Sequence, residues 1–184
     1  MTGFTHLLEH NEHFAATDAK DHVPAIPFLP SRQIYILTCI DPRVDPANIL
    51  ELELGDAIVA RTVGGRANPS FLEDLAWICY LHQTKTPDAD WFEIVVIHHT
   101  DCGSALMADD ELRDGFVVDG HDDQVLRDTA VTDPHRTVPV DVHRILGASF
   151  LPDAVAVSGY AYDVTTGRLS LVAPAATQAL HRAL

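Results

Sequence analysis

The chain has 184 residues, enough for one domain with a sizeable buried core. Hydrophobic residues make up 47% of it and charged residues 21%, and no apolar run approaches the ~20 residues that a membrane-spanning helix needs. The formal net charge of −15 argues against nucleic acid or an anionic membrane surface as a partner. It is compatible with a very soluble enzyme that acts on a small neutral molecule.

The N-terminal segment predicts a short helix followed by an irregular connector. Residues 2–16 show a helical pattern of apolar side chains, formed by Phe4, Leu7, Leu8 and Phe14. A helix of this kind usually needs a neighbour that covers its apolar face. Residues 18–32 carry three spaced prolines, Pro24, Pro27 and Pro30. Because no basic region precedes an apolar one, we expect no signal peptide and a cytoplasmic location.

Two runs of branched apolar residues predict strands that are buried on both faces, Ile34–Leu37 and Ile94–Ile97. After the first run, Asp45 and Pro46 form an N-cap and first-turn pair for a short helix. A further strand is expected at residues 57–61, after the turn that Gly55 and Asp56 indicate.

The clearest helix begins at Asn68 and runs to about His82, because its apolar residues recur at three- and four-residue steps. Cys79 lies inside this pattern and is expected in the core. Ser104 could cap another helix that reaches about Arg113, whereas residues 114–137 are Asp-rich and the least informative part of the chain.

The C-terminal third predicts one more helix and two strands, at residues 141–150, 155–162 and 169–172. Only the last two strands are close enough in sequence to form a hairpin. We therefore expect an α/β fold with a mostly parallel central sheet of four strands plus an antiparallel edge strand, flanked by helices. Nothing in the sequence indicates a second domain within residues 1–184.

Polar side chains follow the two buried strands at the point where each ends. The first strand leads into TCIDPR (residues 38–43) and the second into HHTDCG (residues 98–103). Ligands bind at the carboxyl ends of strands in open α/β sheets, so Cys39, His99 and Cys102 are candidate ligands. Two thiolates and an imidazole suit Zn²⁺, and three protein ligands leave one tetrahedral position open, as in catalytic zinc sites. The sequence therefore predicts one zinc ion per chain.

The combination of Cys-x-Asp-x-Arg after one strand and His-x-x-Cys-Gly after another resembles the β-class carbonic anhydrases, from about Ile34 to Met107. The resemblance implies that Cys39, His99 and Cys102 hold zinc and that Asp41 and Arg43 form a hydrogen-bonded pair beside it. In that family the arginine keeps the aspartate ionised, and the aspartate accepts a hydrogen bond from zinc-bound hydroxide, which attacks carbon dioxide to give bicarbonate. In some members the aspartate binds the zinc instead.

The same resemblance implies an oligomer. In the family the N-terminal helix and connector, residues 1–32 here, pack on a partner subunit. We therefore expect a homodimer or a higher even-numbered homo-oligomer.

The resemblance leaves two classes of substrate open, because the HHTDCG form resembles a branch that also contains carbonyl sulfide and carbon disulfide hydrolases. Many carbonic anhydrases have Arg-Asn-Ala-Gly after the second strand, whereas this chain has Arg61, Thr62, Val63 and Gly64. The change adds bulk and removes an amide from a segment that lines the family's site. Hydrolysis of carbonyl sulfide or carbon disulfide is therefore the alternative to carbon dioxide hydration.

Other interpretations of these residues stay open at this level. The cysteines could belong to a structural zinc module or to a thiol enzyme with Cys39 as its nucleophile, and Asp41 with Arg43 could be a surface ion pair. His98 is expected to pack near the site rather than to be a fourth ligand. Asp101 could orient His99 or cap the following turn.

Overall fold

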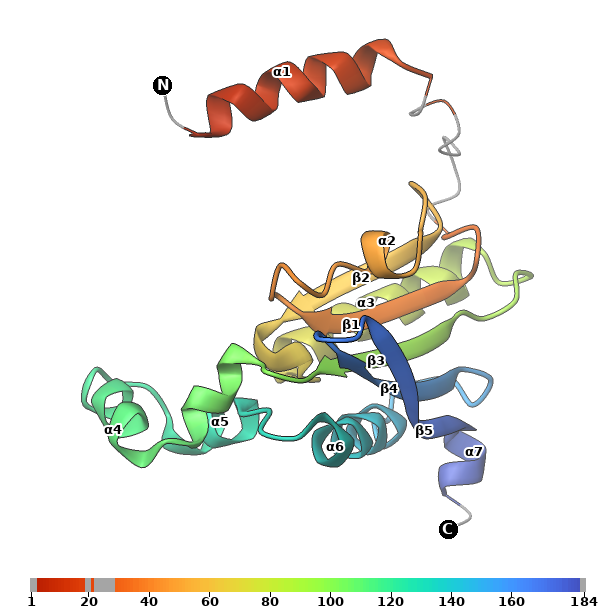
Figure 1. Ribbon diagram of the computed structural model, residues 1–184. Helices are drawn as coiled ribbons and strands as arrows, with labels where there is room; N and C mark the ends of the chain where they lie inside the picture. Colours follow the sequence, from red (N-terminus) through yellow and green to blue (C-terminus); the bar gives the residue numbers. More distant parts are fainter. Residues whose placement is uncertain (1–2, 19–20, 22–28, 183–184) are drawn as a thin grey trace.

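The computed structural model describes residues 3–18, 21 and 29–182 (Figure 1). A five-stranded sheet lies at the centre of the molecule, in the order β2-β1-β3-β4-β5. The strands are β1 (Ile34–Cys39), β2 (Ala57–Thr62), β3 (Glu93–His99), β4 (Ala156–Asp163) and β5 (Arg168–Thr177). The α-helices are α1 (Gly3–Ala16), α2 (Pro46–Ile49), α3 (Pro69–Lys85), α4 (Asp110–Val118), α5 (Asp123–Thr129), α6 (Pro134–Leu146) and α7 (Gln178–His181).

The direction of the strands confirms the predicted fold class. Strands β2, β1, β3 and β4 pair in parallel, and β5 pairs antiparallel with β4 at one edge. The parallel register pairs Thr38 of β1 with Ile97 of β3. The two segments that carry the candidate ligands therefore leave the sheet side by side, at the same edge.

Helices α3 and α6 cover one face of the sheet. Their apolar residues form the main core with alternate residues of β1, β3 and β4. This core includes Leu75 and Val142 from the helices and Leu37, Ile94 and Val157 from the strands, all at most 5% exposed. Helix α6 approaches β4 closely at Gly159, where a Cβ atom would lie 2.9 Å from Cγ2 of Val142. Toward the start of α6, Thr137 lies 2.8 Å from the ring of His98, which places the N-terminal half of the helix near the end of β3.

A smaller apolar cluster lies on the other face, where the strand residues Ile36, Ile97 and Tyr162 are buried together with Val44 from the loop after β1. Ile49 of α2 packs against this cluster. Helix α2 begins as predicted, because the Asp45 side chain accepts a hydrogen bond from the Ala47 N–H and a proline follows the cap.

The segment between β3 and β4 differs from the prediction in its boundaries. A 3₁₀ segment, η3, spans Gly103–Ala108, and α4 begins only at Asp110 because Asp109, not Ser104, supplies the cap. The predicted helix at residues 141–150 is α6, which begins at Pro134 and ends at Leu146. The cap of α6 is again an Asp-Pro pair, since Asp133 accepts a hydrogen bond from the His135 N–H.

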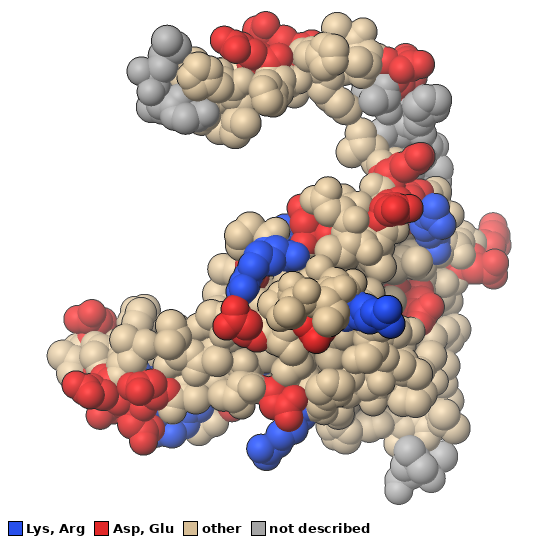
Figure 2. Space-filling model, viewed as in Figure 1, with Lys and Arg blue, Asp and Glu red and all other residues tan. Residues whose placement is uncertain are grey.

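Helix α1 stands apart from the sheet in Figure 1, and its length agrees with the prediction. Its apolar side chains are solvent-exposed, at 66% for Phe4, 54% for Leu7 and 48% for Leu8. Acidic side chains gather over the α4 end of the molecule in Figure 2, consistent with the net charge. None of the helices in the described part of the chain is both long and apolar enough to cross a membrane.

Candidate metal centre

The three predicted ligands converge at the carboxyl edge of the sheet. Cys39 ends β1, His99 ends β3, and Cys102 follows three residues later, after a turn in which Asp101 has a positive φ of 53°. One potential ligand atom from each residue lies within 4.8 Å of the others, and all three residues are buried. The sulfurs are 3.8 Å apart, too far for a disulfide, and both thiols are free.

The orientation of His99 leaves one ring nitrogen available to a metal. Its Nδ1 lies 2.9 Å from the carbonyl oxygen of Thr100, which can only accept, so the proton is on Nδ1. The other nitrogen, Nε2, is buried and has no hydrogen-bond partner within the described residues. A buried lone pair without a partner costs free energy unless an ion binds it. The donor set therefore fits a zinc ion, with the Thr100 carbonyl fixing the ring as second-sphere partners of zinc-bound histidines do.

The two sulfurs lie within hydrogen-bond distance of each other, at 3.8 Å. This contact lowers the pKa of the Cys102 thiol and raises that of the Cys39 thiol, because one proton between the two sulfurs favours a thiol beside a thiolate. The main-chain N–H groups of Asp41 and Gly64 act in the opposite sense on Cys39 and favour its thiolate. Two thiolates can therefore persist together where a cation compensates their charges.

Asp41 and Arg43 form the predicted pair beside these ligands. Arg43 donates from Nε to Asp41 Oδ1 (3.0 Å) and from an Nη to Asp41 Oδ2 (2.8 Å), a bidentate contact. These hydrogen bonds hold the pKa of Asp41 at about 2, so its carboxylate stays ionised. Asp41 Oδ2 lies 3.9 Å from His99 Nε2, and its side chain is only 14% exposed. The carboxylate therefore faces the ligand cluster and not bulk solvent.

Asp101 takes neither of the two roles considered for it. Its carboxylate accepts a hydrogen bond from Arg43 (2.7 Å), and its carbonyl accepts a second one (2.9 Å). Arg43 thus bridges the loop after β1 and the loop after β3. His99 is oriented by Thr100 instead, as described above.

His98 packs beside the site and lies outside the group of three potential ligands among the described residues. Its ring is fully buried, with Nδ1 2.8 Å from Thr137 Oγ1 and Nε2 within 3.2 Å of both the Gly65 carbonyl and Asp141 Oδ2. Asp141 also accepts a hydrogen bond from Arg66 Nε at 2.5 Å. Burial alone would raise the pKa of Asp141, but the hydrogen bonds from His98 and Arg66 outweigh it and lower this pKa.

This buried cluster and Arg61 were not found from the sequence. Arg61 donates to the main-chain carbonyls of Cys39 (2.9 Å) and Asp41 (2.7 Å), which fixes the loop that carries both residues. Arg66 in a loop and Asp141 in a helix are 75 residues apart and carry no local signal that they meet. The sequence analysis singled out the residues that directly follow a strand. That criterion found the candidate ligands and the Asp41–Arg43 pair, but it could not find side chains that reach the site from elsewhere.

A pocket of about 200 Å³ opens onto the cluster, lined by Cys39, Ile40, Asp41, Val63, Gly64, Gly103, Ser104 and Met107. Its side walls are apolar, and Asp41 supplies the carboxylate. Gly64 is required in this wall because its φ is 71° and a Cβ atom would lie 2.9 Å from Ser104 Oγ. The pocket is small, and the candidate ligand Cys39 lines it beside Asp41.

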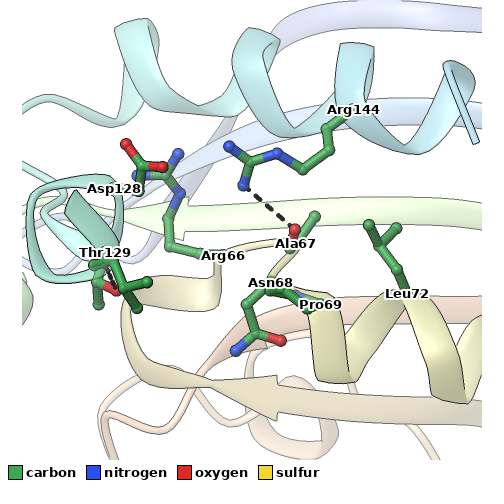
Figure 3. A pocket seen from close by; sticks show the side chains of 9 residues that line it. Arg66, Ala67, Asn68, Pro69, Leu72, Asp128, Thr129 and Arg144 are labelled. Atoms are coloured by element: carbon green, nitrogen blue, oxygen red, sulfur yellow. Dashed lines mark hydrogen bonds between the residues drawn. The ribbon is translucent and has the colours of Figure 1, made fainter. Parts of the chain in front are cut away.

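A second pocket, of about 270 Å³, lies beside the first turn of α3 and is lined by Arg66, Asn68, Leu72 and Arg144 among others (Figure 3). Both arginines bond to Asp141, and Arg144 also donates to the Ala67 carbonyl at 3.2 Å. Their charges are thus already engaged by the buried cluster, so this pocket offers no comparable set of free ligand atoms.

The fold and the site together define an α/β protein with a buried Cys-His-Cys cluster at the carboxyl edge of a mostly parallel sheet. The carbonic anhydrase family model matches residues 34–133, more than half of the chain. The chain therefore belongs to the β-class carbonic anhydrase family.

Relatives and solved structures agree with this assignment. The chain is 29% identical over 153 residues to beta-carbonic anhydrase 1 of Mycobacterium tuberculosis, covering 81% of this chain and 87% of that protein. It is 26% identical to carbon disulfide hydrolase of Saccharolobus solfataricus over 162 residues, with 75% and 76% covered. The crystal structure of carbonic anhydrase from Streptococcus mutans superimposes with a TM-score of 0.72 at 29% identity, covering 94% of this chain and 98% of that one.

Proposed function

We propose that the protein is a zinc enzyme that hydrates carbon dioxide reversibly to bicarbonate, with Cys39, His99 and Cys102 as the metal ligands. The observation that carries the proposal is the buried, unpartnered Nε2 of His99 facing two sulfurs and an ionised aspartate. When bound, the zinc would supply Lewis-acid activation of water at neutral pH.

The residues around the candidate ligands would orient the attacking water and shape the substrate pocket. Asp41, held ionised by Arg43, can accept a hydrogen bond from the attacking water and so direct a lone pair of that water toward the pocket. Arg43 keeps Asp41 in place and ties it to Asp101. The apolar side chains of Ile40, Val63 and Met107 suit a small molecule without charge.

Carbonyl sulfide or carbon disulfide is the second candidate substrate. Val63 lines the pocket and is 44% exposed, so the segment that departs from the common Arg-Asn-Ala-Gly pattern does border the site. Relatives of similar identity also include carbon disulfide hydrolases. Apolar pockets separate near-isosteric molecules by only ~1–3 kcal/mol, so we expect both classes of substrate to react at different rates.

The deciding experiment compares substrates on one zinc-loaded sample. Stopped-flow carbon dioxide hydration is measured beside hydrogen sulfide release from carbonyl sulfide and from carbon disulfide. We expect the largest kcat/KM for carbon dioxide. A larger kcat/KM for either sulfur compound would replace the leading assignment with the second one, and activity that survives complete removal of zinc but not thiol alkylation would favour a thiol enzyme with Cys39 as nucleophile.

We further propose that the chain acts as a single domain in a cytoplasmic homodimer or a higher even-numbered oligomer. The exposed apolar residues of α1 support the assembly, because an uncovered stripe of Phe and Leu is unfavourable in water. Cell fractionation tests the location, and the oligomer is tested below.

A further inference from the structure

We infer that Ser104 tunes the metal centre by donating a hydrogen bond from its hydroxyl to the thiolate of Cys102. The inference rests on the proposed function, because it requires Cys102 to bind a metal as a thiolate. Ser104 itself is a positioning residue in this role and does not contact the substrate.

The hydrogen bonds of Ser104 fix the direction of its proton. The residue is 5% exposed, and its Oγ accepts a hydrogen bond from the main-chain N–H of Val131 at 3.2 Å. The Cys102 sulfur lies 3.2 Å from the same oxygen. Because the Val131 N–H can only donate, the hydroxyl proton is free for the sulfur, and a metal-bound thiolate can only accept it.

The chain supplies such donors to both sulfurs, but from different sources. The N–H groups of Asp41 and Gly64 serve Cys39, and the N–H of Ser104 serves Cys102. Besides the other two ligands, the Ser104 hydroxyl is the only side-chain donor to either sulfur among the contacts of the described residues. It is therefore the donor that a side-chain substitution can remove, although the same substitution also removes the acceptor of the Val131 N–H.

The chemical need for this donor follows from the ligand set. Two thiolates bring two negative charges to a dication, which weakens its Lewis acidity compared with three neutral imidazoles. A hydrogen bond to a thiolate withdraws electron density from the sulfur and so partly restores that acidity. Ser104 would provide this at Cys102, and through Val131 it also links η3 to the residues after α5.

The test uses cobalt(II) in place of zinc and reads the sulfur-to-cobalt charge-transfer absorption. Removing the hydroxyl in Ser104→Ala should leave the sulfur more electron-rich and move the band to longer wavelength. Ser104→Thr, which keeps a hydroxyl, should restore the wild-type position. Ser158→Ala is the matched control, because Ser158 is also buried but donates to Glu93 on the sheet, and it should leave the band unchanged.

X-ray absorption counts the sulfurs bound to cobalt in every sample and should give two throughout. If Ser104→Ala does not fold, Ser104→Cys carries the measurement, with a smaller shift because a thiol is a weaker donor. A Ser104→Ala or Ser104→Cys spectrum that superimposes on the wild type, or an equal shift in Ser158→Ala, overturns the inference and leaves the metal centre standing. A wild-type protein without two cobalt-bound sulfurs overturns the metal centre as well.

Discussion

Each candidate ligand is buried, yet each keeps one donor atom directed at a common point. This arrangement depends on contacts that are local to each residue. The Thr100 carbonyl sets the tautomer of His99, and the positive φ of Asp101 turns the chain back so that Cys102 reaches the cluster. Residue types and their places after strands were readable from the sequence. The turn at Asp101 and the free nitrogen of His99 were not, because both depend on backbone conformation.

Replacing a cysteine ligand should remove the metal. We expect Cys102→Ser to retain only a minor fraction of the zinc, because a hard, largely protonated hydroxyl replaces a thiolate. Metal analysis after dialysis measures zinc per chain, with Cys79→Ala as control, since Cys79 is buried in the core away from the ligands. Stoichiometric zinc in Cys102→Ser would contradict the proposed ligand set.

Neutralising Asp41 should affect turnover and not the metal. Asp41→Asn is expected to lower kcat/KM by ~10²-fold, the scale of a positioned group that handles a proton, while zinc content stays constant. Asp101→Asn is the informative control, because Asp101 also bonds to Arg43 but carries an exposed carboxylate. Equal losses in the two variants would mean that anchoring of Arg43, and not the Asp41 carboxylate, is what matters.

At the scale of elements, the sequence located strands more accurately than the helices between them. Branched apolar runs identified β1 and β3, because strands buried on both faces leave few alternatives. The predicted helix start at Ser104 was wrong, because the Ser104 hydroxyl contacts the Cys102 sulfur and the Val131 N–H and caps no helix. The prediction also began α6 too late, since the helix starts after the Asp133 cap and continues through Pro139.

The buried cluster around Asp141 joins α6 to the segment after β2 and to the end of β3. Asp141→Asn should lower the free energy of unfolding by ~3–5 kcal/mol, because it leaves the Arg66 guanidinium buried without its counter-charge. Urea unfolding measures the change, with the exposed Asp114→Asn as control. A loss within ~0.5 kcal/mol, typical of surface substitutions, would show that the cluster contributes little to stability.

Asp56 connects the residues before β1 to the turn before β2, and this connection should depend on pH. Its carboxylate accepts hydrogen bonds from Arg32 (2.8 Å), Ser31 (2.8 Å) and the Glu53 N–H (3.1 Å), and the Arg32 contact is the main reason that its pKa falls from 3.8 to about 2.

Because the folded-state pKa of Asp56 is lowered, its contribution to stability is complete above about pH 4 and is lost as the pH falls to about 2. Thermal unfolding of Asp56→Asn should therefore show a lower Tm than the wild type at pH 6, and the difference should shrink toward pH 2. A difference that is constant over this range would assign the effect to lost packing and not to the charge.

The whole molecule combines a well-packed sheet domain with a helix that no part of the described chain covers. The sheet and helices α3 and α6 account for the core, whereas the apolar residues of α1 remain exposed. The sequence indicated this helix and its apolar stripe, but a single chain contains no information on the surface that receives them. In the proposed oligomer, that surface would belong to a partner subunit.

If α1 packs on a partner subunit, its leucines should control the oligomeric state. Leu7 and Leu8 are 54% and 48% exposed, and burying a leucine side chain is worth ~1.5–3 kcal/mol. Replacing both with glutamate should therefore weaken association by at least ~10²-fold, the equivalent of ~3 kcal/mol. Light scattering over a dilution series should give twice the 20.1 kDa chain mass, or a higher even multiple, for the wild type and a shift toward the single-chain mass for the variant.

Glu9→Gln with Glu12→Gln changes the same helix without touching its apolar residues and should leave the mass unchanged. A wild-type protein that stays at the single-chain mass up to high micromolar concentration would refute the assembly, and an unchanged Leu7→Glu, Leu8→Glu variant would place the contact on another surface.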